Sequence, residues 1–309
     1  METNEKRPAA FIGVVIAFLG AVLFSTKAII VKLAFAEVKV DALTLLTLRM
    51  LFSLPFYLVA TILITRNPLN QKLSRKEWIY TIGLGLFGYY LSSLFDFIGL
   101  QYISAGLERL ILFLYPSFAV LINAFVFKEP IRRNEGAALV LTYIGIGIAY
   151  YGELSIDTSN AHFLLGSALV FLCAITYSVY IAGSGKLIPR IGANKFTSYA
   201  LLASTGGVFI HYLARGQYDV LQAGMGLWWY GIVLALVATV IPTYMLSYAM
   251  KKIGSTRVAI ISSIGPVSTI LQAHYFLGEQ IFLLQILGTM LVLGGVLLLV
   301  VKTKKVEVV

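Results

Sequence analysis

The chain has 309 residues, of which 59% are hydrophobic and only 12% are charged. Soluble domains carry roughly 25% charged residues, so this composition excludes a single water-soluble domain with one core. The lone cysteine, Cys173, has no disulfide partner within the chain.

Apolar runs separated by short polar breaks predict ten membrane-spanning helices. A helix needs about 20 mostly apolar residues to cross a bilayer, and β-barrel strands would show a polar–apolar alternation that these runs lack. We expect an all-α polytopic membrane protein. The predicted spans lie near 11–34, 41–65, 78–100, 104–127, 136–152, 161–183, 195–213, 226–249, 255–277 and 280–301.

We expect the first apolar run, from Phe11 to about Ala34, to be a span and not a removed signal peptide. It is longer than the apolar core of a signal peptide and is not followed by a clear small-residue cleavage site.

Basic residues predict the orientation of the spans. With ten spans, eighteen lysines and arginines fall in segments on the side of the N-terminus, and only Lys39 and Arg215 fall on the other side. Basic loops stay in the cytoplasm, so we expect both termini in the cytoplasm. The protein itself would lie in the cytoplasmic membrane. Contact with anionic lipid headgroups accounts for the net charge of +10 without a nucleic-acid partner.

The two halves of the chain, 1–153 and 154–309, predict an internal repeat. Residues 96–151 align with 246–301 without a gap. The identities at this offset include Pro116 with Pro266, Glu129 with Glu279, and Gly145 with Gly295. Five spans per half invert the second copy, and inverted repeats are typical of secondary transporters that work by alternating access.

With this repeat, with Phe24 in the first helix and with Arg49 in the second, the chain resembles the EamA-type permeases of the drug/metabolite transporter superfamily. The resemblance implies two five-helix repeats in an inner-membrane carrier, often an exporter. Its substrates would be amino acids, related metabolites, nucleotide-linked sugars or drugs. It also implies that helices one to four and six to nine surround the cavity, while helices five and ten lie outside and can mediate a homodimer.

Six ionisable residues fall within the predicted spans, where each costs about 2.5–3.5 kcal/mol on insertion scales and tends to face a partner, water or a cavity. They are Lys27, Lys32, Arg49, Asp96, Glu108 and Arg109. One interpretation is a transport site in which Glu108, in preference to Asp96, binds and releases a proton. Lys27 and Arg49 would then meet a carboxylate or phosphate of the substrate, or pair with Glu108.

The other interpretation of these charges is structural. Asp96 and Arg109 are equally distant from the predicted turn at Gln101–Ser104, which brings them to one depth in adjacent helices. They would form a fixed ion pair, while Lys32 would extend to the membrane interface. The sequence leaves both interpretations open because it does not fix the rotation of a helix.

A polar stripe marks the ninth predicted span, where Ser262, Gly265, Thr269 and Gln272 share one helical face. Such a stripe either lines an aqueous path or hydrogen-bonds a neighbouring helix. The matching face of the fourth span carries Tyr115. On the sixth span, Tyr177 is a candidate substrate contact, with aromatic packing as the alternative.

The repeated prolines, Pro116 and Pro266, are candidate hinges or fixed kinks, because proline removes a backbone donor from a helix. Glu129 and Glu279 lie at helix junctions, where helix capping or the architecture of the repeat explains them better than substrate contact. In helices five and ten, glycines predict close packing; these are Gly145, Gly147, Gly288, Gly294 and Gly295.

The pattern as a whole predicts a small-molecule secondary transporter that exports metabolites such as amino acids by alternating access. Coupling to protons and exchange of one solute for another both fit this pattern, and drug efflux or nucleotide-sugar or phosphate exchange are the alternatives. A channel or an intramembrane enzyme is less favoured, since no hydrolase or phosphate-loop motif occurs. The three histidines do not cluster at ligand spacing, so we expect no metal and no cofactor.

Overall fold

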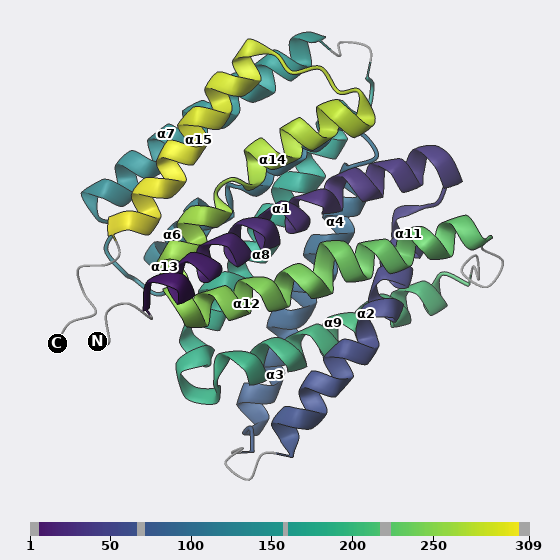
Figure 1. The fold of residues 1–309 in the computed structure, drawn as a ribbon, viewed down its shortest axis with the longest axis vertical. Helices are drawn as coiled ribbons and strands as arrows, with labels where there is room; N and C mark the ends of the chain where they lie inside the picture. The colour runs from purple at the N-terminus through teal and green to yellow at the C-terminus, as the bar shows by residue number, and fades with distance from the viewer. Residues whose placement is uncertain (1–5, 67–71, 157–159, 217–223, 303–309) are drawn as a thin grey trace.

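The computed structural model describes residues 6–66, 72–156, 160–216 and 224–302, and these residues form helices joined by short connections (Figure 1). Within those ranges there is no strand, which confirms the all-α class. The helices are α1 (Lys6–Val38), α2 (Ala42–Thr65), α3 (Arg75–Gly85), the π-helical η1 (Leu86–Leu91), α4 (Ser92–Gly99), α5 (Ala105–Leu112), α6 (Tyr115–Val126), α7 (Arg133–Ile156), α8 (Phe163–Ile191), α9 (Ala193–Ala214), α11 (Met225–Ala235), the π-helical η2 (Leu236–Val240), α12 (Ile241–Ile253), α13 (Ser255–Ser262), α14 (Gly265–Gln272), the π-helical η3 (Ala273–Leu277) and α15 (Leu283–Lys302).

Within the part of the chain that the structure describes, seven helical segments are long and apolar enough to cross a membrane. They are Phe11–Val38, Ala42–Thr65, Arg75–Gly99, Ala105–Val126, Arg133–Ser155, Phe163–Ile191 and Met225–Ile253. The three other predicted spans coincide with α9, with α13, α14 and η3 together, and with α15, all of which are helical. The chain is therefore a multi-pass membrane protein, and the count of ten spans stays a prediction.

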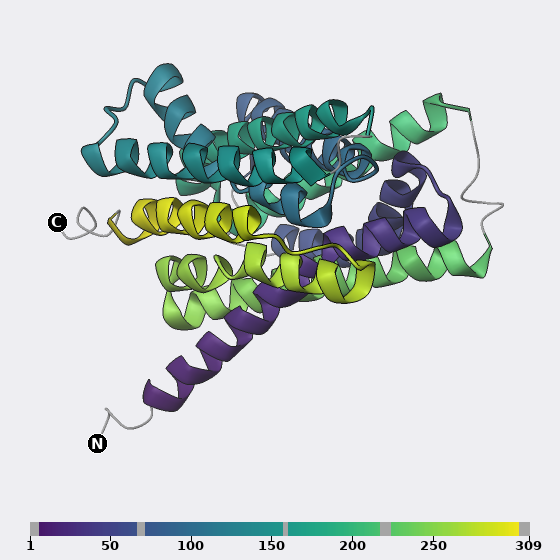
Figure 2. The ribbon, with the colours of Figure 1, turned by 90° about the horizontal axis from the view of Figure 1, so that it is seen from above.

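Helix α1 runs through the middle of the bundle (Figure 1). It packs against α11 and α12 on one side and against α5, α13 and α14 on the other. Figure 2 shows the start of α1 projecting from the bundle, and there Phe11 is largely exposed. We call the end of the bundle where α1 begins and α15 ends the terminal face, and the end where α1 stops and α5 begins the far face.

Side-chain caps fix the starts of three helices. Ser104 caps α5, Ser74 and Glu77 form a capping box at α3, and Asp41 accepts the Leu43 and Thr44 N–H groups of α2. Burial alone would raise the pKa of the Asp41 carboxyl, but hydrogen bonds from Thr44 and Arg215 outweigh it and hold the pKa below its usual value.

Two helices break at the repeated prolines. The helical course is interrupted between α5 and α6 just before Pro116, and between α13 and α14 just before Pro266. Each proline lies in the first turn of the second piece, where its missing N–H costs nothing. The sequence offset of 150 therefore corresponds to a matched break in two helices, while hinge motion at either proline stays a prediction.

Helices α7 and α15 lie side by side along one margin of the bundle (Figure 1). Their small residues face each other, since a Cβ atom added at Gly288 would lie 2.8 Å from Ala149 Cβ. The predicted close packing of helices five and ten thus occurs within one chain at Gly145, Gly288 and Gly295, but not at Gly147 or Gly294, where no atom lies within 4 Å of an added Cβ. A homodimer through the same helices would have to use their outer faces, which carry Val140 and Met290.

We predict opposite effects of alanine at two glycines of α15. Gly288→Ala should lower the free energy of unfolding by about 1–3 kcal/mol, because overpacking forces neighbouring backbone apart. Gly294→Ala should be neutral or raise it by about 0.5–1 kcal/mol, because no atom lies within 4 Å of the added Cβ and alanine favours helix. Thermal unfolding of the purified protein in detergent measures both, and equal effects would contradict this packing.

Candidate functional site

A buried charge cluster joins α1, α4 and α5. The Lys27 Nζ atom lies 2.5 Å from Oδ2 of Asp96 and 3.5 Å from Oε1 of Glu108. The exposed fractions of these side chains are 12% for Lys27, 2% for Asp96 and 0% for Glu108. Two carboxylates therefore share one ammonium group inside the protein.

The local structure explains why these residues meet. Helices α4 and α5 are joined by the short turn at residues 100–104, and Ser104 caps the start of α5. Antiparallel neighbours place positions on either side of a turn at one depth, so Asp96 and Glu108 face the same level of α1. Lys27 reaches that level from α1 and contacts both carboxylates.

The cluster is not fully satisfied. Oδ1 of Asp96 and Oε2 of Glu108 are buried and have no hydrogen-bond partner among the described residues. A buried carboxylate oxygen without a donor is costly. Fully ionised, the three groups carry a net charge of −1, so the cluster has the capacity to take up one proton or one cationic group of a ligand.

The predicted ion pair between Asp96 and Arg109 is wrong. Asp96 pairs with Lys27, and Arg109 makes no ion pair with any described residue. Successive helical residues point about 100° apart, so when Glu108 faces Lys27 its neighbour Arg109 faces elsewhere. Residue counts from the turn suggested a pairing, but they carry no information about the rotation of α5.

Arg109 instead lies against aromatic rings and α14. Its guanidinium carbon is 5.8 Å from the ring centroid of Phe24 and 5.4 Å from that of Phe113. A Cβ atom at Gly265 would lie 2.8 Å from Nη2 of Arg109, so a larger residue there would require this guanidinium to shift. Nε of Arg109 is buried without a hydrogen-bond partner in the described chain, which leaves a cation available to an anionic group.

Arg49 is a second buried guanidinium, on α2. It lies 5.5 Å from the ring centroid of Phe97, and its Nε also has no hydrogen-bond partner among the described residues. It forms no ion pair with them, so contact with a substrate stays a prediction for this residue.

The candidate tyrosines belong to an aromatic row. Tyr115 and Tyr177 are 5.1 Å apart edge to face, and Tyr177 stacks on Tyr180 at 5.8 Å between centroids. Tyr180 and Tyr89 also share a hydrogen bond of 3.1 Å between their hydroxyls. The aromatic-packing interpretation thus applies to Tyr177, and Tyr89 was missed because its partner lies on another helix.

The polar stripe of the ninth predicted span faces α1. Thr269 Oγ1 lies 3.5 Å from the Ser25 carbonyl oxygen, and Gln272 Nε2 lies 3.5 Å from the Val22 carbonyl oxygen, both on α1. Ser25 Oγ in turn donates to the carbonyl of Gly265 at 3.2 Å. These contacts favour the interhelical interpretation for Thr269 and Gln272. Ser262 is half-buried, and its contact with a substrate stays a prediction.

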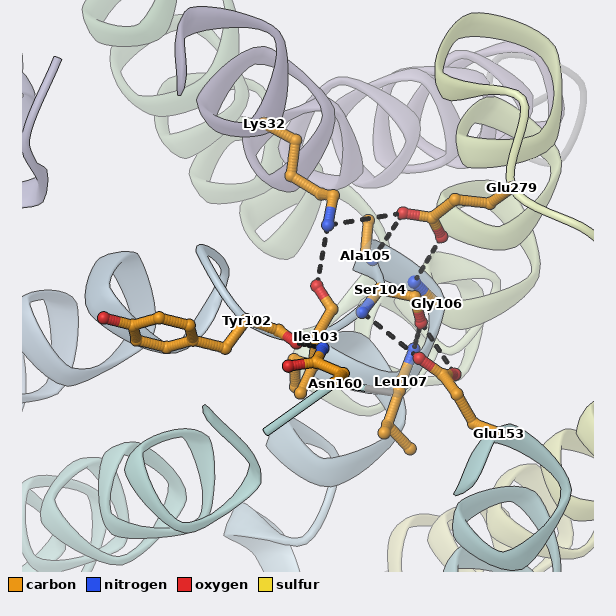
Figure 3. A network of polar contacts seen from close by, with 10 residues as sticks. All are labelled: Lys32, Tyr102, Ile103, Ser104, Ala105, Gly106, Leu107, Glu153, Asn160 and Glu279. Carbon is orange, nitrogen blue, oxygen red and sulfur yellow. Dashed lines mark hydrogen bonds and ion pairs between the residues drawn. The ribbon is translucent and has the colours of Figure 1, made fainter. Parts of the chain in front are cut away.

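Helix junctions on the far face form a second polar network (Figure 3). Glu279 accepts the N–H groups of Ala105 at 2.9 Å and Gly106 at 3.3 Å, which confirms the capping interpretation for this residue. Glu153 accepts the Ser104 hydroxyl at 2.7 Å. Lys32 does not simply extend to the interface as predicted, since it donates to the Ile103 carbonyl at 2.7 Å and lies 3.7 Å from Glu279.

The fold and the buried charges define a helical membrane protein with a polar centre, and comparisons with known proteins identify its class. The EamA-like transporter family model matches residues 11–151 and again 164–301. The chain belongs to this family, within the drug/metabolite transporter superfamily, and is therefore a membrane transporter and not an enzyme.

Relatives named as transporters occur in bacteria and archaea. The uncharacterized transporter YcbK of Bacillus subtilis is 30% identical over 96% of this chain and 93% of its own length. An uncharacterized transporter of Archaeoglobus fulgidus is 23% identical over 81% of this chain and 87% of its own. A solved crystal structure at 19% identity shares the fold, with a TM-score of 0.63 over 96% of this chain and 98% of that one.

We predict strong coupling between Lys27 and Asp96. Lys27→Met should lower the free energy of unfolding by about 3–5 kcal/mol, because it leaves two buried carboxylates without their cation. Adding Asp96→Asn should restore a large part of that loss. Arg109→Met combined with Asp96→Asn is the matched control and should be additive within about 0.5 kcal/mol.

Denaturant or thermal unfolding in detergent measures this cycle. Additive losses for Lys27 and Asp96, or strong coupling between Arg109 and Asp96, would contradict the geometry of the cluster.

Proposed function

We propose that this protein is a secondary transporter that exports small metabolites such as amino acids across the cytoplasmic membrane by alternating access. Ten spans in two inverted five-helix repeats, 1–153 and 154–309, would enclose the site, with both termini in the cytoplasm. The observation that carries the proposal is the sharing of Lys27 by Asp96 and Glu108 beside the unpaired guanidinium of Arg109.

The charges of the cluster match a zwitterion. An ammonium group of the substrate would bind the unpartnered oxygens of Glu108 and Asp96, and its carboxylate would bind Arg109. Aromatic rings at Phe24 and Phe113 exclude water around that guanidinium, which strengthens its attraction for an anion. Arg49 and Tyr115 would complete the wall of the site.

Proton coupling would use the same cluster. Glu108 is the more deeply buried carboxylate and the one farther from Lys27 Nζ, so it is the group that a proton would neutralise. A substrate ammonium and a proton would then compete for Glu108. Because the two compete for one site, a proton that enters the cell would be exchanged for a substrate molecule that leaves it. This exchange requires no cofactor.

A second candidate function is the exchange of anionic, phosphate-bearing metabolites. It is favoured by two buried guanidinium groups, Arg49 and Arg109, whose Nε atoms have no hydrogen-bond partner among the described residues. Such an exchanger would need a counter-substrate and no proton gradient. A thermal-stabilisation screen with amino acids, nucleotides, sugars and cationic drugs separates the classes, because a bound ligand raises stability by mass action.

We predict that Glu108→Gln abolishes transport driven by a pH gradient, while substrate exchange at equal pH persists with a weaker apparent affinity because Asp96 still offers a carboxylate to the substrate ammonium. The amide keeps the shape of the side chain but binds no proton in the physiological range. Flux into proteoliposomes loaded with the ligand found by the screen measures both modes. Glu135→Gln, outside the site and still able to cap α7, is the control and should behave as the unmodified protein. An unchanged pH dependence in a folded Glu108→Gln variant would refute proton coupling at this residue.

A further inference from the structure

The far face is held together by a carboxylate from the second half of the chain. Glu279, beyond η3, accepts the first two N–H groups of α5, those of Ala105 and Gly106. Lys32 of α1 lies 3.7 Å from the same carboxylate and donates to the turn before α5 (Figure 3). This contact joins the helix that carries Glu108 to the opposite repeat.

The sequence repeat supplies the same parts on the terminal face. Glu129 corresponds to Glu279, and Ser255 at the start of α13 corresponds to Ala105, both at the offset of 150. Lys186 of α8 does not align with Lys32 in the repeat, but it makes the corresponding contact, with its Nζ 2.7 Å from Oε1 of Glu129. Each face therefore carries a lysine–glutamate pair drawn from the two halves of the chain.

The two faces differ in how deeply the lysine–glutamate pair is buried and in whether side chains cap the neighbouring helix start. The pair of Lys32 and Glu279 is largely buried, with exposed fractions of 24% and 19%, whereas Lys186 and Glu129 are 50% and 49% exposed. At the start of α5, Ser104 and Glu279 both accept backbone N–H groups. At the start of α13 the preceding residue is Gly254, which has no side chain to do so.

We propose that Glu279 and Glu129 are reciprocal gate residues of the transport cycle. The structure is the state in which Glu279 caps α5 and closes the far face. In the opposite state Glu279 leaves α5, and Glu129 accepts the first N–H groups of α13 and closes the terminal face. The proposal rests only on the alternating-access part of the proposed function, and not on the substrate or on Glu108.

Physical chemistry favours a carboxylate for this task. The first N–H groups of a helix have no partner within the helix, and they carry the positive end of its dipole. When the glutamate carboxylate approaches the helix start, it accepts hydrogen bonds from these N–H groups. When it moves away, the N–H groups become exposed to water as that face opens. Glu108 follows Ala105 by less than one turn, so movement of the start of α5 also shifts Glu108 relative to Lys27.

Hydrogen–deuterium exchange of the purified full chain, without ligand, tests the proposal. Glu279→Gln should raise the exchange of amides 104–108 about two- to fivefold, as expected for a weakened charge at a helix start. It should also slow the exchange of amides 254–258. Glu129→Gln should do the reverse at both segments, and the double variant should return both toward the unmodified protein.

Lys32→Met is a second variant that weakens the far-face contact, because it removes only the cation beside Glu279. It should also raise the exchange of amides 104–108 and slow that of amides 254–258. Glu135→Gln is the control for a carboxylate outside both gates. If the exchange rate changes only at the mutated face, with no opposite change at the other face, the proposal is overturned. Glu279 would then be only a cap of the α5 start. Proteoliposome flux measured separately tests transport, so failure of the gate and failure of the proposed function are distinguishable.

Discussion

One lysine that serves two buried carboxylates is the interaction on which the centre of this protein depends. Lys27 contacts Asp96 and Glu108 where water is excluded. Neither carboxylate would be stable there as an ion without the lysine, and the lysine would be equally unfavourable alone. The two helices that carry the carboxylates, α4 and α5, are thereby fixed in rotation relative to α1. The site also keeps the capacity to take up one proton or one cation.

The surrounding contacts follow from that arrangement. With Glu108 turned to α1, Arg109 must face α14, and the absence of a side chain at Gly265 makes space for it. Ser25 and Thr269 then tie α1 to the same helix. The cap on the start of α5 holds this assembly from the far face. Charge satisfaction, small-residue packing and helix capping therefore act on the same few helices.

Sequence reasoning reached part of the site. The cost of charge in a membrane singles out Lys27, Asp96 and Glu108 from the sequence, and all three meet in the structure. The pairing of Asp96 with Arg109 was wrong because depth was inferred from residue counts while rotation was unknown. The row of tyrosines through Tyr89 was missed because nothing local indicates a partner on a distant helix.

The sequence by itself determined the class of the protein. Apolar runs of span length require helices in a membrane, since backbone polar groups there must be satisfied within each segment. The repeated Pro116 and Pro266 correspond to matched helix breaks. Tertiary structure alone decided which charges meet, because ion pairs depend on rotation and on contacts between residues far apart in the chain. It also decided that Glu279 and Glu129 differ in environment, since identical positions in a repeat acquire different neighbours only when the two halves pack together.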